Sequence, residues 1–255
     1  MKNKVLSAAL VLSLAFAMSA CSSGISVEKE TKESQTVKEE EKKAEKLAVK
    51  IEKVDISDEE GGKVYQDIKY PVITCNDPVL QKSFDEFNKD FKEKAEEFKY
   101  LNRNEVRNQI VETNNEDGGY SNDTEASISY QGNNYLSIMT NTYIFTMGAH
   151  GTTVIGGYNY DIKTGKRLKL EDFIKDKEEL RKYLKDWTKK QEEGMLFEWA
   201  DETIDEYLDK DEYELQCAIH EGELSVFFQQ YDIAAYAVGI IEIPIDKSLL
   251  KVDIN

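Results

Sequence analysis

A single apolar stripe constrains the fold of this chain more than any other feature. Large apolar side chains recur every three or four residues between positions 80 and 98, a spacing that places them on one face of an α-helix. The residues of the stripe are Leu80, Phe84, Phe87, Phe91, Ala95 and Phe98. Asn76, Asp77 and Pro78 precede it as a helix start, with a capping side chain and then a first-turn proline. We therefore expect a long amphipathic helix whose aromatic face is buried in a core.

Other segments carry the alternation of apolar and polar residues that is typical of half-buried β-strands. These segments are 63–75, 124–130, 135–147, 213–220, 224–231 and 240–245. The central pattern is a hairpin over 143–170, in which a turn at 148–151 joins two strand-like runs. Gly148 and Gly151 suit this turn because glycine adopts positive φ without steric cost, and His150 lies between them.

Two shorter apolar stripes predict further helices over 180–187 and 197–208. The whole pattern predicts an α+β domain, in which an antiparallel β-sheet meander is packed by the long amphipathic helix and by the further helices. We place this domain at residues 61–255, with two subregions at about 64–145 and 146–250.

The N-terminus has the features of a secretory signal peptide. Lys2 and Lys4 precede an apolar run that is too short to span a bilayer. The run ends in small residues before Cys21, which resembles the lipobox of bacterial lipoproteins. That resemblance implies removal of residues 1–20, lipidation of Cys21, and a membrane anchor on the extracellular side of the cell membrane. The alternative is an ordinary signal peptide cut near Ala20, with Cys21 incidental.

Residues 21–60 are rich in Glu and Lys and contain no aromatic residue. Such a composition buries too little apolar surface to offset the conformational entropy that is lost on ordering. We therefore expect a disordered charged linker that holds the following domain away from the membrane. Gly61 and Gly62 mark its end.

The chain is acidic, with 50 Asp and Glu residues against 33 Lys and Arg residues and a formal charge of −17. Loss of Lys2 and Lys4 with the signal peptide would take this charge to about −19. Such a chain repels phosphate groups, which argues against nucleic acid as a partner. It attracts basic proteins at long range, although solubility alone also accounts for the charge.

Beyond Cys21 the chain has two cysteines, Cys75 and Cys217. An oxidising exterior would allow them to form a disulfide. Two free thiols, each packed as a small apolar group, are the equal alternative. Cys217 and His220 have a CxxH spacing, but Cys75 has no such neighbour and a single pair of ligands is too few for a metal ion, so the sequence does not indicate a metal site.

His150 is the residue whose chemistry best suits catalysis, because histidine titrates near neutral pH. The only other histidine is His220, and a metal site would need both to converge with a carboxylate. A histidine in a glycine turn more often hydrogen-bonds the backbone, and the sequence has no serine-nucleophile or phosphate-loop motif. We therefore expect a non-enzyme with no catalytic residue, metal or cofactor. A cell-wall-acting or metal-dependent enzyme that uses His150 is the alternative.

Three motifs, taken in order, resemble one domain family. They are Gly-Ala-His-Gly at 148–151, Asn-Tyr-Asp-Ile-Lys-Thr-Gly-Lys at 159–166, and Phe-Phe-Gln-Gln-Tyr-Asp-Ile-Ala-Ala-Tyr-Ala-Val-Gly at 227–239. They resemble the extracellular domain of the lysozyme-sensing anti-sigma factor RsiV and the non-catalytic N-terminal domain of the peptidoglycan deacetylase PdaC. The resemblance covers about residues 64–250 and implies an α+β domain, with which RsiV binds lysozyme. Where the family loop often reads Ala-Pro-Tyr, this chain has Ala234, Ala235 and Tyr236, so it lacks a proline that would fix φ.

The resemblance and the charge favour a cell-surface binding module, a sensor, decoy or inhibitor that recognises lysozyme, another basic protein or cell-wall glycan. The predicted contact residues are Tyr231, Ala235 and Tyr236, because exposed tyrosines are effective interface anchors. The chain is expected to act as a monomer. It shows neither an anti-sigma segment nor the paired-histidine motif of a deacetylase. A purely structural envelope lipoprotein is the remaining alternative.

Overall fold

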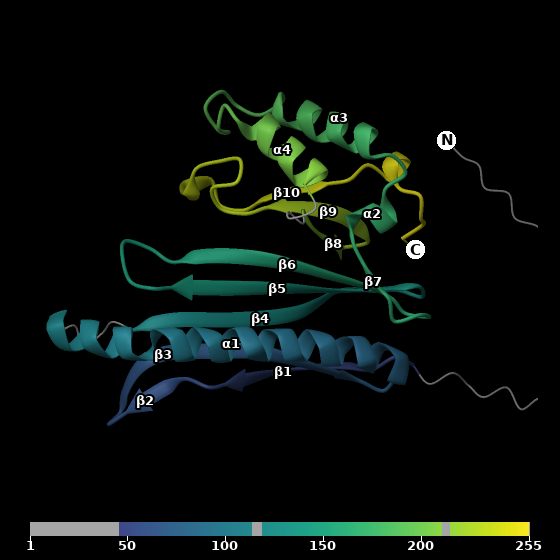
Figure 1. Ribbon diagram of the computed structural model, residues 1–255. Coiled ribbons are helices and arrows are strands. Elements are labelled where there is room, and N and C mark those ends of the chain that lie inside the picture. Colours follow the sequence, from purple (N-terminus) through teal and green to yellow (C-terminus); the bar gives the residue numbers. More distant parts are fainter. Residues whose placement is uncertain (1–45, 114–118, 211–214, 255) are drawn as a thin grey trace, which may run out of the picture. The chain divides into compact units, whose positions relative to one another are not determined.

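The computed structural model describes residues 46–113, 119–210 and 215–254, which form two β-sheets and a set of helices (Figure 1). The larger sheet has seven strands in the order β1-β3-β4-β5-β6-β7, with β2 paired to β3. Its strands are β1 (Val49–Asp55), β2 (Asp58–Glu60), β3 (Lys63–Cys75), β4 (Tyr120–Gln131), β5 (Tyr135–Phe145), β6 (Thr152–Asp161) and β7 (Arg167–Leu168). The smaller sheet has the order β10-β9-β8. Its strands are β8 (Gln216–His220), β9 (Glu223–Phe228) and β10 (Ile241–Pro244).

One long helix and several short ones complete the α+β fold that the sequence predicts. The helices are α1 (Pro78–Thr113), α2 (Leu170–Phe173), α3 (Lys177–Thr188) and α4 (Ala200–Asp209), with 3₁₀ turns η1 (Tyr236–Val238) and η2 (Lys247–Leu249). Of the helices in the described part of the chain, none combines the length and the hydropathy needed to cross a membrane.

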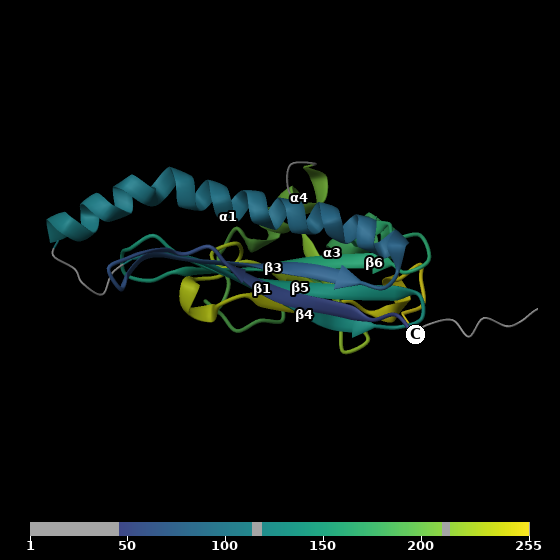
Figure 2. The same ribbon diagram turned by 90° about the horizontal axis from the view of Figure 1, so that it is seen from below.

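The apolar stripe is buried under α1 as predicted. The Oδ1 atom of Asp77 accepts hydrogen bonds from the backbone N–H groups of Val79 and Leu80, both at 2.9 Å, and so caps the first turn. The buried stripe residues are Leu80, Phe84, Phe87, Phe91 and Ala95, and they pack with Ile68, Ile73, Leu136, Ile138 and Tyr160 of the sheet. The helix therefore covers one face of the larger sheet (Figure 2).

The larger sheet is mostly antiparallel, as expected, with one exception. β3 and β4 run parallel because α1 connects them and returns the chain to the same end of the sheet. The pairs β1–β3, β2–β3, β4–β5, β5–β6 and β6–β7 are antiparallel. The expected meander is therefore correct from β4 to β7 and is preceded by a strand–helix–strand crossover.

Part of the expected linker belongs to this sheet. β1 pairs with β3 along its whole length, and β2 pairs with the start of β3. The prediction that 21–60 is entirely disordered is therefore wrong for β1 and β2. Composition could not reveal that Val49, Ile51 and Val54 pack against the core under α1. The remaining N-terminal predictions, for the signal peptide at 1–20, for lipidated Cys21 and for the linker at 21–45, lie outside the described residues.

The expected boundary between two subregions near residue 145 falls inside the β5–β6 hairpin. These strands pair from Tyr135 opposite Asp161 to Ile144 opposite Thr152, so residues on both sides of the boundary share one sheet. A second apolar core lies between the smaller sheet and helices α2 to α4. Its members include Phe173, Leu184, Ile204, Val226 and Ile243.

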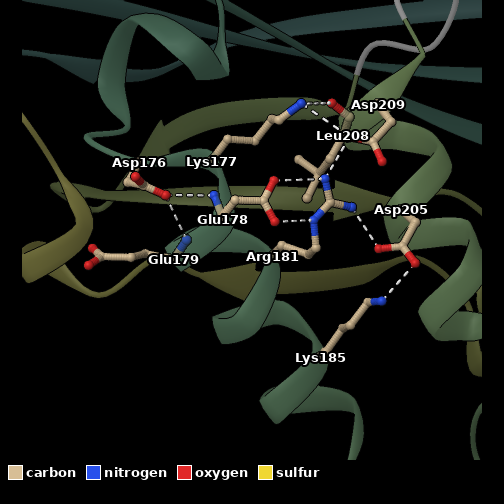
Figure 3. Close-up of polar contacts among 9 residues, drawn as sticks. All are labelled: Asp176, Lys177, Glu178, Glu179, Arg181, Lys185, Asp205, Leu208 and Asp209. Carbon is tan, nitrogen blue, oxygen red and sulfur yellow. Dashed lines mark hydrogen bonds and ion pairs between the residues drawn. The ribbon is translucent and has the colours of Figure 1, made fainter.

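Ion pairs join α3 to α4 (Figure 3). Arg181 of α3 donates to Asp205 and to Asp209 of α4, each at 2.6 Å, and Lys185 contacts Asp205 at 2.7 Å. Hydrogen bonds from Lys185 and Arg181 lower the pKa of Asp205. Hydrogen bonds from Arg181 and Lys177 lower that of Asp209 in the same way. The carboxylates on this side of the two helices are therefore neutralised by cations of the chain itself.

A buried polar network joins the two sheets. Asn159 of β6 donates from Nδ2 to the carbonyl oxygen of Cys217 at 2.9 Å, and its Oδ1 atom accepts from Ser137 Oγ at 2.8 Å. The backbone N–H of Ile219 donates to Ser137 Oγ at 3.1 Å and to Asn159 Oδ1 at 3.2 Å. Asn159 and Ser137 are both 0% exposed. The side chains of Ser137 and Asn159 thus bind backbone groups of β8, which holds β8 against the larger sheet.

Glutamine side chains occupy the outer edge of β6. Three backbone N–H groups at alternate positions each donate to a glutamine Oε1 atom from the smaller sheet or the loop after it. The bonds run from Thr153 to Gln230 at 2.8 Å, from Ile155 to Gln229 at 2.8 Å, and from Gly157 to Gln216 at 3.1 Å. The Nε2 atom of Gln229 also donates to the carbonyl oxygen of Ile155 at 3.0 Å.

Candidate functional site

The turn of the β5–β6 hairpin presents His150 at the surface. Gly148 has φ of +109°, the conformation for which glycine is suited. The preceding Met147 adopts φ of +67°, which is uncommon for a residue with a side chain. Gly151 serves a different purpose from the one predicted: it is buried, and a Cβ atom there would overlap the ring of Tyr143. The turn therefore needs Gly148 for its backbone conformation and Gly151 for space.

The loop after β9 carries the predicted contact residues. Tyr231 has φ of +71° and is 52% exposed. Asp232 fixes the loop, because its Oδ2 atom accepts from the N–H of Gln229 at 2.6 Å and from the hydroxyl of Tyr207 at 2.9 Å. Ala235 is exposed and has φ of −65°, the value that a proline would impose. The loop thus reaches this backbone angle without the proline of the related domains.

These two segments, about 80 residues apart in sequence, meet in a cluster of three rings. The imidazole of His150 stacks on Tyr236, with ring centroids 3.8 Å apart and planes inclined by 24°. The hydroxyl of Tyr236 donates to the carbonyl oxygen of Gly151 at 3.1 Å. The hydroxyl of Tyr231 lies 3.4 Å from His150 Nε2. We call His150, Tyr231 and Tyr236 the His150 cluster.

Hydrogen bonding determines the tautomer of His150 in this arrangement. Nδ1 lies 3.0 Å from the carbonyl oxygen of Gly151, which can only accept, so Nδ1 carries the proton. Nε2 of the neutral ring is then the acceptor for the hydroxyl of Tyr231. The ring is therefore held by three contacts, two of them to tyrosines of the other segment.

The surroundings of the two histidines differ. His220 lies on β8 with its Nδ1 atom 3.8 Å from Glu242, whereas the contacts of His150 are to Gly151, Tyr231 and Tyr236. The described residues contain no group of three His, Cys, Asp or Glu side chains that could hold a metal ion. The structure thus does not bring the histidines to a common site within the described part of the chain.

The His150 cluster lies on the surface, outside the groove that borders β6 and β9. One groove of about 500 Å³ lies between α1, the β5–β6 face and β9. Its lining includes Phe91, Thr142, Val154, Tyr158 and Phe227, and no residue of the cluster. Rings at the surface offer contact area to a macromolecule, whereas small ligands are usually enclosed in a concave site.

In the structure the two cysteines beyond Cys21 are free thiols. Cys75 lies at the end of β3, with its Sγ atom 3.2 Å from the carbonyl oxygen of Asp77. Burial raises the pKa of the Cys75 thiol. Cys217 lies buried on β8 within the core of the smaller sheet. The thiols belong to different apolar clusters, which explains why they do not pair.

Sequence reasoning missed one aromatic pair, in which Trp199 is exposed and Phe197 is half-buried. Phe197 and Trp199 were expected within a helix over 197–208, but α4 begins at Ala200. The two rings stack in the loop before α4, with centroids 4.5 Å apart. The signal that could have revealed them is their i, i+2 spacing, which does not place two side chains on one face of a helix.

Comparison with known proteins is consistent with this architecture. Residues 57–153 match the family model "Deacetylase PdaC", and residues 168–248 match that of "Protein of unknown function (DUF3298)". No curated protein matches the chain significantly.

Two solved structures are similar to this chain. A member of the DUF3298 family from Bacteroides fragilis NCTC 9343 has a TM-score of 0.51 at 19% identity, over 81% of this chain and 95% of that one. A DUF3298 family protein from Pseudomonas aeruginosa PAO1 has a TM-score of 0.48 at 18% identity, over 82% of this chain and 95% of that one. The first likeness shows a shared fold. The chain thus has a region similar to the PdaC family model followed by one similar to the DUF3298 model, in agreement with the resemblance to the N-terminal domain of PdaC.

Proposed function

We propose that this chain is a non-catalytic binding module that recognises a basic protein such as lysozyme through the His150 cluster. The observation that carries the proposal is the meeting of His150 with Tyr231 and Tyr236 at the surface. Tyrosines with rigid rings and one polar end are effective anchors at protein interfaces. The formal charge of −17 supports attraction of a basic partner.

Backbone strain at the cluster also supports a functional role. Among the described residues, the non-glycine residues with positive φ are Met147, Glu221 and Tyr231. Two of the three, Met147 and Tyr231, lie in the segments that form the cluster. Such conformations cost free energy and gather at functional sites, because the surrounding structure must compensate for them.

In the proposed setting the module is a cell-surface lipoprotein, anchored through Cys21 on the extracellular side of the membrane. The region between Cys21 and β1 would then separate the module from the lipid. Cell-wall glycan is the second partner that the resemblance suggests, and the binding experiment below includes it as a competitor.

The test is calorimetric titration with hen lysozyme at about 20 mM and about 150 mM salt, since screening weakens charge steering over this range. Replacing an interface anchor by alanine typically costs about 2 kcal/mol or more, so Tyr236→Ala is expected to weaken binding by about 30-fold. Tyr100→Ala is the matched control, because Tyr100 is 84% exposed on α1. Soluble peptidoglycan fragments should not displace lysozyme if the protein is the ligand.

Two outcomes would contradict the proposal. One is the absence of lysozyme binding at both salt concentrations, which removes lysozyme as the partner. The other is equal loss of affinity in Tyr236→Ala and Tyr100→Ala, which removes the His150 cluster as the site. The enzyme alternative is tested separately: a change in cell-wall chemistry that requires His150 and is lost in His150→Ala would favour it over a non-enzyme.

A further inference from the structure

The loop before α4 presents a rigid aromatic surface outside the His150 cluster. Phe197 and Trp199 stack with their planes inclined by 19° and their centroids 4.5 Å apart. Trp199 is 51% exposed, whereas tryptophan is buried to a high degree on average. Phe197 therefore covers one face of the indole, while about half of the Trp199 surface remains accessible to solvent.

Backbone hydrogen bonds fix both rings in place. The N–H of Phe197 donates to the carbonyl oxygen of Ile233 at 2.9 Å, which ties it to the loop that carries Tyr231. The carbonyl oxygen of Trp199 accepts from the N–H of Thr203 at 3.0 Å in the first turn of α4. The hydroxyl of Thr203 reaches the carbonyl oxygen of Asp232 at 3.4 Å. The aromatic pair is therefore preorganised, and it lies beside the segment that contributes to the His150 cluster.

The segment that carries this pair is acidic. Residues 192–202 contain five carboxylates and no Lys or Arg. The carboxylates are Glu192, Glu193, Glu198, Asp201 and Glu202. All except Asp201 are exposed, and none of the four exposed ones forms an ion pair with another described residue. Asp201 instead accepts a hydrogen bond from Thr188 at 2.7 Å.

The opposite ends of α3 and α4 show how this chain treats carboxylates elsewhere. There Arg181 and Lys185 neutralise Asp205 and Asp209 (Figure 3). The exposed carboxylates near Trp199 form no ion pair with a cation in the described part of the chain. A cation from another molecule could neutralise them, as Arg181 and Lys185 neutralise the carboxylates of α4.

We propose that Trp199, backed by Phe197 and flanked by Glu198 and Glu202, binds an arginine side chain of a basic protein partner. An indole face is the strongest of the aromatic cation–π acceptors. A guanidinium group stacks flat on such a face and still donates to carboxylates at its edge. We call this site the Trp199 platform. The proposal rests on the proposed function, because it takes the partner to be basic. It adds a specific contact on this chain for one of the partner's arginine side chains.

The chain already makes this contact with its own cations. The guanidinium of Arg107 lies 4.4 Å from the ring centroid of Tyr65, and that of Arg167 lies 4.7 Å from that of Tyr158. Within the described residues, no such cation lies over Trp199. The indole of Trp199, a stronger cation–π acceptor than the ring of a tyrosine, is thus available to a cation of a partner.

The test is the binding of a fluorescein-labelled hexa-arginine peptide, measured by anisotropy with the full chain at about 20 mM salt. A hexa-citrulline peptide has the same shape without the charge and should not bind. Trp199→Leu is expected to weaken hexa-arginine binding by about tenfold. Glu198→Gln with Glu202→Gln should also weaken it. Glu112→Gln, a change at an exposed glutamate of α1, is the charge control and should have little effect.

Intrinsic fluorescence gives a second readout that does not require loss of the tryptophan. The chain has two tryptophans, so a Trp187→Phe variant leaves Trp199 as the only tryptophan, and excitation at the red edge of absorption selects its emission over that of the tyrosines. Its emission should change on addition of hexa-arginine and not of hexa-citrulline. Circular dichroism confirms that each variant is folded. Equal peptide affinity of Trp199→Leu and the parent chain, or unchanged Trp199 emission at saturating peptide, would overturn the inference.

The outcomes separate this inference from the proposed function. If lysozyme binding depends on Tyr236 while hexa-arginine binding ignores Trp199, the Trp199 platform is wrong and the His150 cluster stands. If hexa-arginine binds through Trp199 while lysozyme does not bind at all, the Trp199 platform stands and lysozyme is not the partner.

Discussion

Replacing Asn159 by alanine tests whether the polar network between the sheets holds this fold together. Asn159 is the centre of that network, with hydrogen bonds to Ser137, Cys217 and Ile219. It lies on β6, the last long strand of the larger sheet, and its partners on β8 belong to the smaller one. The substitution removes the donor and the acceptor while leaving both strands intact.

The expected cost follows from the bonds that are lost. The carbonyl oxygen of Cys217 loses the donor at 2.9 Å, and the hydroxyl of Ser137 loses the acceptor at 2.8 Å. The N–H of Ile219 keeps its bond to Ser137 at 3.1 Å. Leaving a buried polar group without its partner costs about 1–3 kcal/mol. With the small cavity that the shorter side chain leaves, we expect a loss of about 4 kcal/mol in the free energy of unfolding.

Urea denaturation followed by circular dichroism and by tryptophan fluorescence measures this loss. A loss of about 4 kcal/mol corresponds to a fall in Tm of roughly 8–16 °C for a domain of this size. Both tryptophans lie in the α3–α4 region, so fluorescence reports on the smaller sheet and its helices. If the network couples the two sheets, the fluorescence and dichroism transitions should coincide in the parent chain and separate in Asn159→Ala.

Asn141→Ala is the matched control, because Asn141 is an exposed asparagine on β5 of the same sheet. Its effect should lie within about 0.5 kcal/mol of zero. A double-mutant cycle with Ser137→Ala should give a coupling energy of about 1–2 kcal/mol, since Ser137 and Asn159 share Ile219 as a partner. The reasoning is refuted if Asn159→Ala costs less than about 1 kcal/mol while the two transitions remain superimposed.

Three further predictions concern single sites. Burial alone would raise the pKa of Asp58, but the hydrogen bonds and positive charges of Arg107 and Arg103 together outweigh this effect and lower it. A carboxylate whose pKa is lowered in the folded state stabilises the fold above about pH 4, and this stability is lost as the pH falls through the folded-state pKa. In urea titrations the parent chain should therefore lose more stability than Asp58→Asn between neutral and acidic pH. Gln66 is fully buried, and neither of its amide atoms has a hydrogen-bond partner among the described residues. Gln66→Met should therefore raise the free energy of unfolding by about 1–2 kcal/mol, measured in the same urea titrations. A loss of stability would contradict this and show that the amide has a partner in solution. A Cβ atom at Gly157 would overlap the carbonyl oxygen of Cys217, so Gly157→Ala should cost about 3 kcal/mol by thermal unfolding, and an unchanged Tm would show that β8 can move away.

Features set by local pattern could be predicted from the sequence. The stripe from Leu80 to Phe98 predicts α1 because its spacing directly encodes one helix face. The β5–β6 hairpin was predictable because glycine turns and alternating residues act over short distances. β1 escaped prediction because its few apolar residues gain their cover from β3 and α1, which composition does not report. The direction of β4 relative to β3 also depends on where α1 returns the chain.

The candidate site shows the same division. Tyr231, Tyr236 and His150 could each be selected from sequence as residues of interest, but not their contact with one another. That contact depends on the packing of the smaller sheet against β6, which is determined by side chains such as Asn159 and Gln229. Trp199 was missed because a helical pattern downstream extended the predicted helix over it. Long-range packing, and not local propensity, therefore decides which exposed rings form a site.

The glutamines along β6 have a consequence for the behaviour of the molecule at high local density. A strand from a neighbouring copy could extend the sheet only by displacing Gln216, Gln229 and Gln230 from the backbone donors that they occupy. Intermolecular sheet growth along this margin thus competes with amide contacts that are already formed. Copies at high local density would therefore not join along this edge of β6. The rings of the His150 cluster would then stay accessible to other molecules.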